Sequence, residues 1–107
     1  MENRLYNNTQ IQKLIVEKAK TLPLLSLDEL CNEEYSNRVF GNIYPVFKKC
    51  PSNYKSDQIN KIKRDDNGYN RWTVKYKFER EGNFYLVSTQ WYPRNDELVR
   101  IWLRNNY

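Results

Sequence analysis

The chain has 107 residues, of which 39% are hydrophobic, 15% aromatic and 29% charged, with a net charge of +5. This length and composition predict a single globular domain over residues 1–107 and exclude a disordered chain. No apolar run approaches the roughly 20 residues that span a bilayer, and the first four residues, MENR, lack the pattern of a signal peptide. We therefore expect a cytoplasmic protein without a membrane partner.

Metal and cofactor chemistry has little support in the sequence. Histidine is absent, and neither Cys31 nor Cys50 has a companion Cys or His at metal-ligand spacing. Without an export signal, both cysteines are expected to be reduced thiols. The three glycines, Gly41, Gly68 and Gly82, are too scattered for a phosphate-binding loop or a dinucleotide fingerprint. The sequence therefore predicts no metal site and no cofactor.

The first part of the chain predicts two helices. Residues 9–22 repeat apolar side chains at three- and four-residue spacing, and Asn8 or Thr9 can serve as the N-cap. Residues 26–29, with the sequence SLDE, have the form of a capping box. This box predicts a second helix that can continue to a left-handed terminator at Gly41.

A β-prone stretch and a basic segment follow. Residues 42–47 are apolar, but Pro45 lacks a backbone donor, so we expect an edge strand there. Residues 48–64 carry six basic residues and one acidic residue, and so hold most of the net charge. We expect a loop at the start of this segment, a short helix from Ser56, and a turn at residues 65–68 before the next strand.

Residues 71–92 give the strongest structural signal, which is a β-hairpin around Glu81 and Gly82. Pairing Arg80 with Asn83 fixes the register of the two strands. In this register an apolar face is formed by four pairs, namely Trp72–Trp91, Val74–Thr89, Tyr76–Val87 and Phe78–Tyr85. The other face is polar and carries Arg71, Thr73, Lys75, Lys77, Ser88, Gln90 and Tyr92.

The end of the chain predicts a C-terminal helix. Asn95 can cap it, Asp96 and Glu97 lie in its first turn, and Arg104 lies in its last, each charge matching the helix dipole. Its apolar stripe is expected to cover the aromatic face of the hairpin. The predicted fold class is therefore α+β, a small two-layer domain with N-terminal helices, an antiparallel sheet built on the 71–92 hairpin, and a C-terminal helix packed on the sheet.

This order of helices, antiparallel strands and final helix resembles the layout of RelE-type bacterial toxins, which are small basic ribonucleases. The resemblance is one of layout alone, and no motif residue can be matched. The resemblance implies RNA cleavage. Because the chain has no histidine, a Ser-His-Asp triad, a Cys-His pair and a histidine acid–base pair are all excluded. Such a site would use lysine and arginine to stabilise the scissile phosphate, without a metal.

We therefore predict a small basic RNA-binding protein, with a metal-independent ribonuclease toxin of a bacterial conflict system as its enzymatic form. Lysine and arginine hold the RNA backbone, and tyrosine stacks on exposed bases. The polar hairpin face is equally consistent with a solvated outer face. No catalytic residue is assigned, and the predicted binding residues are Lys48, Lys49, Lys55, Lys61, Lys63, Arg64, Arg71, Lys75, Lys77, Ser88, Gln90 and Tyr92.

The alternative is a non-enzymatic protein-binding partner, such as an immunity protein or another inhibitor. Abundant Tyr, Trp, Arg and Asn on a compact scaffold also suits a protein interface. The missing histidine favours this alternative, whereas the positive charge disfavours it if the target is itself a basic nuclease.

Overall fold

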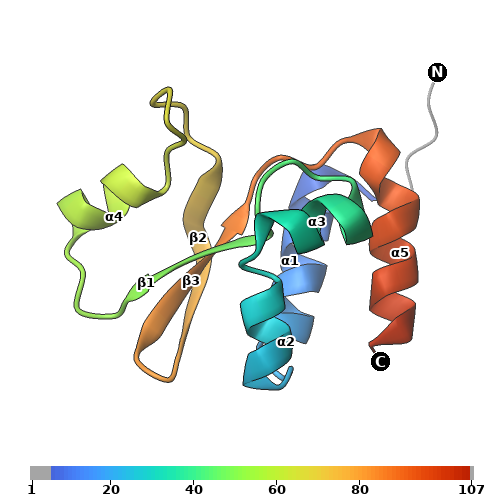
Figure 1. The fold of residues 1–107 in the computed structure, drawn as a ribbon, viewed down its shortest axis with the longest axis horizontal. Helices are drawn as coiled ribbons and strands as arrows, with labels where there is room; N and C mark the ends of the chain where they lie inside the picture. Colours follow the sequence, from blue (N-terminus) through green and yellow to red (C-terminus); the bar gives the residue numbers. More distant parts are fainter. Residues whose placement is uncertain (1–5, 107) are drawn as a thin grey trace.

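The computed structural model describes residues 6–106, which form five α-helices, one 3-10 turn and a three-stranded antiparallel sheet (Figure 1). The predicted α+β class is confirmed. None of the helices in this part of the chain is long and apolar enough to cross a membrane. The elements are α1 (Asn8–Ala19), α2 (Leu24–Glu29), α3 (Glu33–Phe40), β1 (Phe47–Pro51), α4 (Ser56–Ile62), β2 (Trp72–Arg80), β3 (Asn83–Ser88), η1 (Pro93–Asn95) and α5 (Asp96–Asn105).

Helix α1 is capped one residue earlier than predicted. The Asn7 side chain accepts a hydrogen bond from the Gln10 amide (2.8 Å), and the Gln10 side chain accepts one from the Asn7 amide (2.9 Å). Asn8 does not fill this role because its side-chain oxygen accepts from the Gln12 side chain (2.6 Å), while its side-chain amide donates to the carbonyl of Thr89 (2.8 Å). The predicted cap at Asn8 or Thr9 is therefore wrong, and Asn8 instead ties α1 to the end of the hairpin.

The predicted second helix is two helices, α2 and α3. Ser26 lies inside α2, so the predicted capping box does not form. Asn32 starts α3 instead, because its side chain accepts from the Tyr35 amide (2.9 Å). Gly41 ends α3 in the left-handed conformation (φ 69°), as predicted. A side chain there would also crowd Leu98, whose Cδ1 would lie 3.4 Å from an added Cβ.

The sheet has the strand order β1-β3-β2, so β1 is an edge strand. Its position differs from the prediction, since it starts at Phe47 and includes residues 48–51, which were expected to form a loop. The residues before it are held by other contacts. The Asn42 side chain donates to the Gln90 carbonyl (3.0 Å), and the Val46 carbonyl accepts from the Ser88 amide (2.7 Å).

The register of the hairpin is correct near the turn and wrong beyond it. Arg80 pairs with Asn83 and Phe78 with Tyr85, but Thr73 then pairs with Val87. Residues 74–77 of β2 therefore lie opposite a single residue of β3, Leu86. This irregularity is a bulge with three extra residues in β2. An odd number moves the start of β2 to the other face of the sheet. The predicted pairs Trp72–Trp91, Val74–Thr89 and Tyr76–Val87 do not form, and Trp72 lies opposite Ser88.

As a consequence, the two tryptophans of the hairpin lie in different cores. Trp91 belongs to the main core between the sheet and the helices α1, α3 and α5. Trp72 belongs to a smaller cluster with Cys50, Ile59 and Leu86, which α4 covers from the other side of the sheet. The prediction that both tryptophans lie on one face of the hairpin is therefore wrong.

Helix α5 completes the helical layer (Figure 1). It packs mainly against α1 and α3, and α1 lies between it and the sheet. Asn95 is the N-cap residue of α5, as predicted, but its side chain makes no capping hydrogen bond to that helix. Its buried side chain accepts from the Tyr92 amide (2.8 Å) and donates to the Phe40 carbonyl (2.8 Å), which fixes the 3-10 turn η1 against α3. The two cysteines, Cys31 and Cys50, are free thiols, as predicted.

Candidate functional site

The candidate site is built on the segment 89–92, which leaves the sheet after β3 and is irregular. Side chains from other elements satisfy its backbone. Asn8 of α1 donates to the carbonyls of Thr89 (2.8 Å) and Trp91 (3.2 Å), and Asn42 donates to the carbonyl of Gln90 (3.0 Å). The Gln90 amide donates to the Ser88 hydroxyl (3.1 Å). Together with the bond from the Thr89 amide to the Arg71 carbonyl (2.9 Å), these contacts hold the irregular segment in one position.

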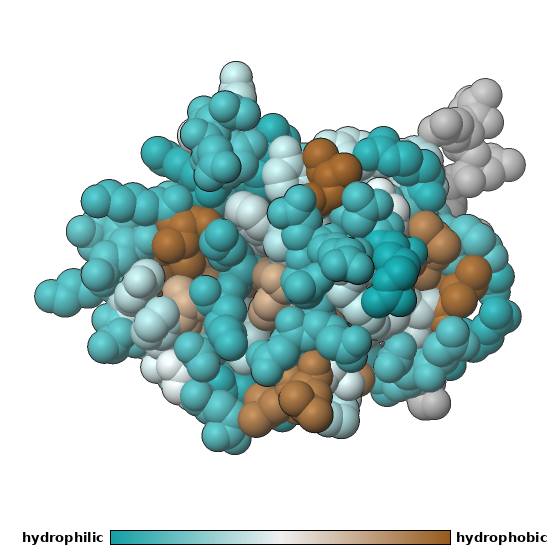
Figure 2. Space-filling view, viewed as in Figure 1, coloured by the Kyte–Doolittle hydropathy of each residue, from teal (hydrophilic) through white to brown (hydrophobic). Residues whose placement is uncertain are grey.

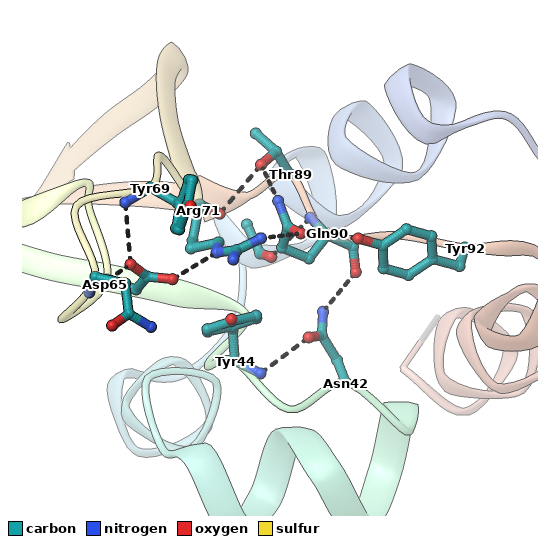
Figure 3. A network of polar contacts seen from close by, with 10 residues as sticks. Asn42, Tyr44, Asp65, Tyr69, Arg71, Thr89, Gln90 and Tyr92 are labelled. Carbon is teal, nitrogen blue, oxygen red and sulfur yellow. Dashed lines mark hydrogen bonds and ion pairs between the residues drawn. The ribbon is translucent and has the colours of Figure 1, made fainter.

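Arg71 lies at the centre of the site (Figure 3). Its Nε donates to Asp65 Oδ2 (2.8 Å), and its Nη1 donates to Gln90 Oε1 (3.0 Å). The guanidinium carbon lies 5.0 Å from the ring centre of Tyr44 and 5.4 Å from that of Tyr69. Two hydrogen bonds and two aromatic rings therefore fix the orientation of this cation.

Asp65 is held as a carboxylate by its surroundings. The hydrogen bond from Arg71 lowers the pKa of Asp65, and the backbone amides of Tyr69 and Asn67, which donate to Oδ1, lower it further. The same hydrogen bond raises the pKa of Arg71. An ionised acid whose two oxygens both accept hydrogen bonds is a weak base, so Asp65 is suited to positioning Arg71 rather than to removing a proton from a substrate.

A surface pocket of about 360 Å³ opens beside Arg71. Two arginines, two tyrosines, two amide side chains and one exposed aliphatic side chain surround it. We call it the Arg71 pocket, and its lining residues are Asn42, Ile43, Tyr44, Arg71, Gln90, Tyr92 and Arg94. The Tyr92 hydroxyl donates to Gln90 Oε1 (2.9 Å), and the Arg94 guanidinium lies 4.8 Å from the centre of the Tyr92 ring. The pocket thus combines positive charge with exposed aromatic surface.

A second hollow adjoins the first, since Tyr44 lines both. In it the Lys48 ammonium lies 5.0 Å from the centre of the Trp72 ring. We call it the Trp72 hollow, and it is lined by Glu33, Tyr44, Pro45, Lys48, Arg64, Asp65, Asp66 and Trp72. Because Asp65 is paired with Arg71, the remaining charges there are two cations and two carboxylates.

The structure brings the predicted binding residues together in part. The basic residues of α4 and its ends lie on the side of the sheet where Trp72 is packed, and these are Lys55, Lys61, Lys63 and Arg64. Lys77 reaches the same side, with its ammonium 4.9 Å from the centre of the Phe84 ring and near Ile59 of α4. Arg71, Gln90 and Tyr92 meet in the Arg71 pocket. Lys75 is exposed on the bulge of β2.

Two predicted residues lie elsewhere. Lys49 points to the opposite face of β1 from Lys48 and pairs with Asp28 of α2 (3.4 Å). Ser88 is fully buried, and its hydroxyl accepts from the backbone of Gln90. Neither side chain is available to the surface formed by the Arg71 pocket, the Trp72 hollow and α4.

Sequence reasoning missed several residues of the site. Tyr44 and Ile43 were assigned to an edge strand, and Asp65 to a turn. No local pattern indicates that this turn returns to Arg71, because the contact depends on the fold of residues 65–70, where the Asp65 amide donates to the Tyr69 carbonyl (2.8 Å). Arg94 follows a proline, and no sequence pattern indicates that it stacks on Tyr92.

The arrangement suits the binding of an anionic, partly aromatic ligand. Within residues 6–106, no group of three or more Cys, Asp or Glu side chains is placed to hold a metal ion. No family model matches the sequence, and neither the comparison with curated proteins nor that with solved structures finds a similar protein. The function is therefore inferred from the site itself.

Proposed function

We propose that the protein binds single-stranded RNA along the Trp72 hollow and the basic residues of α4. The observation that carries the proposal is the Lys48 ammonium above the Trp72 ring, beside Arg64 and next to the pocket that contains Arg71. Cations hold the phosphates of a single strand, and exposed aromatic rings stack its bases. Trp72 is 5% exposed and positions Lys48, whereas Tyr69 beside Arg71 is 64% exposed and can stack a base.

The distribution of charge supports this side of the molecule. The segment 48–64 has six basic residues and one acidic residue, and of these six only Lys49 faces the helical layer, where it pairs with Asp28. Among the acidic residues of α2 and α3, Asp28, Glu29 and Glu34 border the hollow between those two helices, whereas Glu33 lines the Trp72 hollow. A polyanion is therefore attracted to the α4 side.

We propose binding rather than cleavage as the activity of this surface. A ribonuclease needs a group that accepts the 2′-hydroxyl proton, and the carboxylate bonded to Arg71, Asp65, has a lowered pKa and bonds on both oxygens. We expect a labelled RNA incubated with the protein to remain intact on a denaturing gel. Specific cleavage products would instead support the ribonuclease toxin.

Fluorescence anisotropy with a labelled single-stranded RNA tests the proposal. We expect binding at low salt that weakens as salt is raised, with a slope of about 0.7 per phosphate contact. Lys61→Glu should weaken binding about fivefold at roughly 100 mM salt and reduce the slope, because each lost phosphate contact has that effect. The double variant Lys75→Glu/Lys77→Glu should weaken binding in the same way.

Lys13→Glu is the matched control, since Lys13 is an exposed lysine on α1, on the other side of the sheet. It makes the same change in net charge and should alter binding less. The proposal fails if the wild-type protein does not bind RNA at low salt. It also fails if the Lys13 and Lys61 variants lose affinity equally, because the attraction would then depend on net charge and not on this surface.

A second candidate function is a protein-binding partner, which a separate surface favours. Leu25 of α2 is 81% exposed beside a hollow of about 420 Å³ between α2 and α3, and Leu24 next to it is 39% exposed. Figure 2 shows hydrophobic residues at the lower edge of a mostly hydrophilic face, where Figure 1 places α2. The hollow is bordered by the acidic residues Asp28, Glu29 and Glu34. A partner protein that binds the wild type and the Lys61→Glu variant, but not the Leu25→Asp variant, would support this candidate.

A further inference from the structure

The Arg71 pocket has the size and the fixed geometry of a small-ligand site. Its volume of about 360 Å³ falls in the range of ligand pockets, about 300–1,000 Å³. Its base is already rigid, because Asp65 and Gln90 hold Arg71, and the Gln90 side-chain amide donates in turn to the Thr89 hydroxyl (2.8 Å). A ligand would therefore enter a preformed site.

The cations of the pocket favour a phosphate group. A guanidinium has five N–H donors, and the bonds to Asp65 and Gln90 use Nε and one proton of Nη1. The protons on Nη2 remain for an anionic ligand. Arg94 is exposed, lines the same pocket and stacks on Tyr92, so its guanidinium is also held in place. Two oriented guanidinium groups are well suited to phosphate oxygens.

The walls of the pocket favour a flat ring. Ile43 and Tyr92 are 57% and 42% exposed, which is high for side chains of this size, and the Tyr44 ring lies 5.0 Å from the Arg71 guanidinium. Aromatic faces of this kind stack on unpaired bases without strong preference for one of them. The two amide side chains bind protein groups, since Asn42 bonds the backbone and Gln90 bonds Arg71 and Tyr92. We therefore expect little discrimination between bases.

We propose that the Arg71 pocket binds one nucleotide unit, with its phosphate on Arg71 and Arg94 and its base against Tyr44 and Tyr92. This inference rests on the proposed RNA-binding function and assigns one unpaired nucleotide of the strand to a defined position. The same chemistry is present in a free nucleoside monophosphate, so the experiment includes both forms of the ligand.

Three small probes test the chemistry, namely adenosine 5′-monophosphate, adenosine and inorganic phosphate, each titrated into ¹⁵N-labelled protein. The expected result is that the monophosphate shifts the backbone amides of residues 42–44, 89–92 and 94 and binds about tenfold more tightly than either fragment. It should also compete with labelled RNA. Equal binding of phosphate alone would overturn the inference, because the pocket would then be a simple anion site.

Arg94→Gln should weaken the monophosphate and the RNA about fivefold each, by loss of one phosphate contact. The matched control is Arg38→Gln, because Arg38 stacks on Tyr35 of α3 in the same manner (5.5 Å) but lines neither the Arg71 pocket nor the Trp72 hollow. It should leave both affinities unchanged. If RNA binds but the monophosphate neither binds nor competes, the inference fails and the proposed function stands. If the monophosphate binds and RNA does not, the proposed function fails and the pocket is a site for free nucleotides.

Discussion

Asp65 and Arg71 form the ion pair that links the turn before the hairpin to the hairpin itself. Their atoms Oδ2 and Nε are 2.8 Å apart, and 26% of the Arg71 side chain and 11% of the Asp65 side chain is exposed. The turn supplies the other bonds to the carboxylate through the amides of Asn67 and Tyr69. One acid thus determines both the shape of the turn and the direction of the arginine.

This pair predicts a loss of stability in acid. The folded-state pKa of Asp65 is lowered, so the pair stabilises the protein fully above the pKa of an unfolded aspartate, about 3.9, and this contribution is lost as pH falls through the lower folded value. Thermal unfolding followed from pH 7 to pH 2.5 should show a smaller acid loss for Asp65→Asn than for the wild type. Equal loss in both proteins would contradict the assignment.

Trp91 is predicted to be one of the most sensitive core residues. It is 1% exposed, its ring packs edge-on against Phe40 with centres 5.7 Å apart, and its indole nitrogen donates to the Ser88 carbonyl (2.8 Å). Trp91→Ala should lower the free energy of unfolding by about 3–5 kcal/mol, measured by urea denaturation. Leu25→Ala, at an exposed position, should change it by less than about 0.5 kcal/mol. A loss below about 1 kcal/mol for the Trp91 variant would contradict its place in the core.

The register of the hairpin shows what local sequence can and cannot predict. Glu81 and Gly82 both have positive φ (50° and 78°), as a two-residue hairpin turn requires, so the pairs nearest the turn follow from turn chemistry. The bulge at residues 74–77 does not. Its result is to place Trp72 beside Ile59 of α4, a contact that depends on a distant element. An alternating pattern cannot reveal such a shift, because both faces of the sheet are covered and each accepts apolar side chains.

The candidate site also depends on contacts that the local sequence does not predict. Arg71, Gln90 and Tyr92 were predicted to lie together because they share the polar face of a regular hairpin, and they do meet. They meet through an irregular segment, however, which Asn8 and Asn42 hold from 81 and 48 residues away in the sequence. These asparagines carry no local signal for such a role, because each would equally fit a helix cap or a turn.

Arg80 is predicted to stabilise the end of α1. Its guanidinium donates from the hairpin to the carbonyls of Leu22 and Ala19, which follow and end that helix. Arg80→Met keeps the apolar stem but removes these bonds, and should lower the free energy of unfolding by about 1–2 kcal/mol. Lys20→Met, which breaks the exposed pair with Glu17 (3.2 Å), should cost no more than about 0.5 kcal/mol. Urea denaturation of both variants checks the order, and equal losses would contradict a specific role of Arg80.

The thiol of Cys31 is predicted to react slowly with alkylating reagents in the folded protein. Burial raises its pKa to about 11, and the nearby Lys49 ammonium offsets this only in part. Since the thiolate is the reactive form, its fraction at pH 8 is about a hundredfold smaller than that of a thiol with a pKa near 9.0. Mass spectrometry after timed iodoacetamide treatment should show slow labelling that speeds up about tenfold per pH unit and becomes fast in urea, with Cys31→Ser used to assign the signal. Rapid labelling at pH 8 without denaturant would show that the thiol is not held in the core beside Asp28 and Lys49.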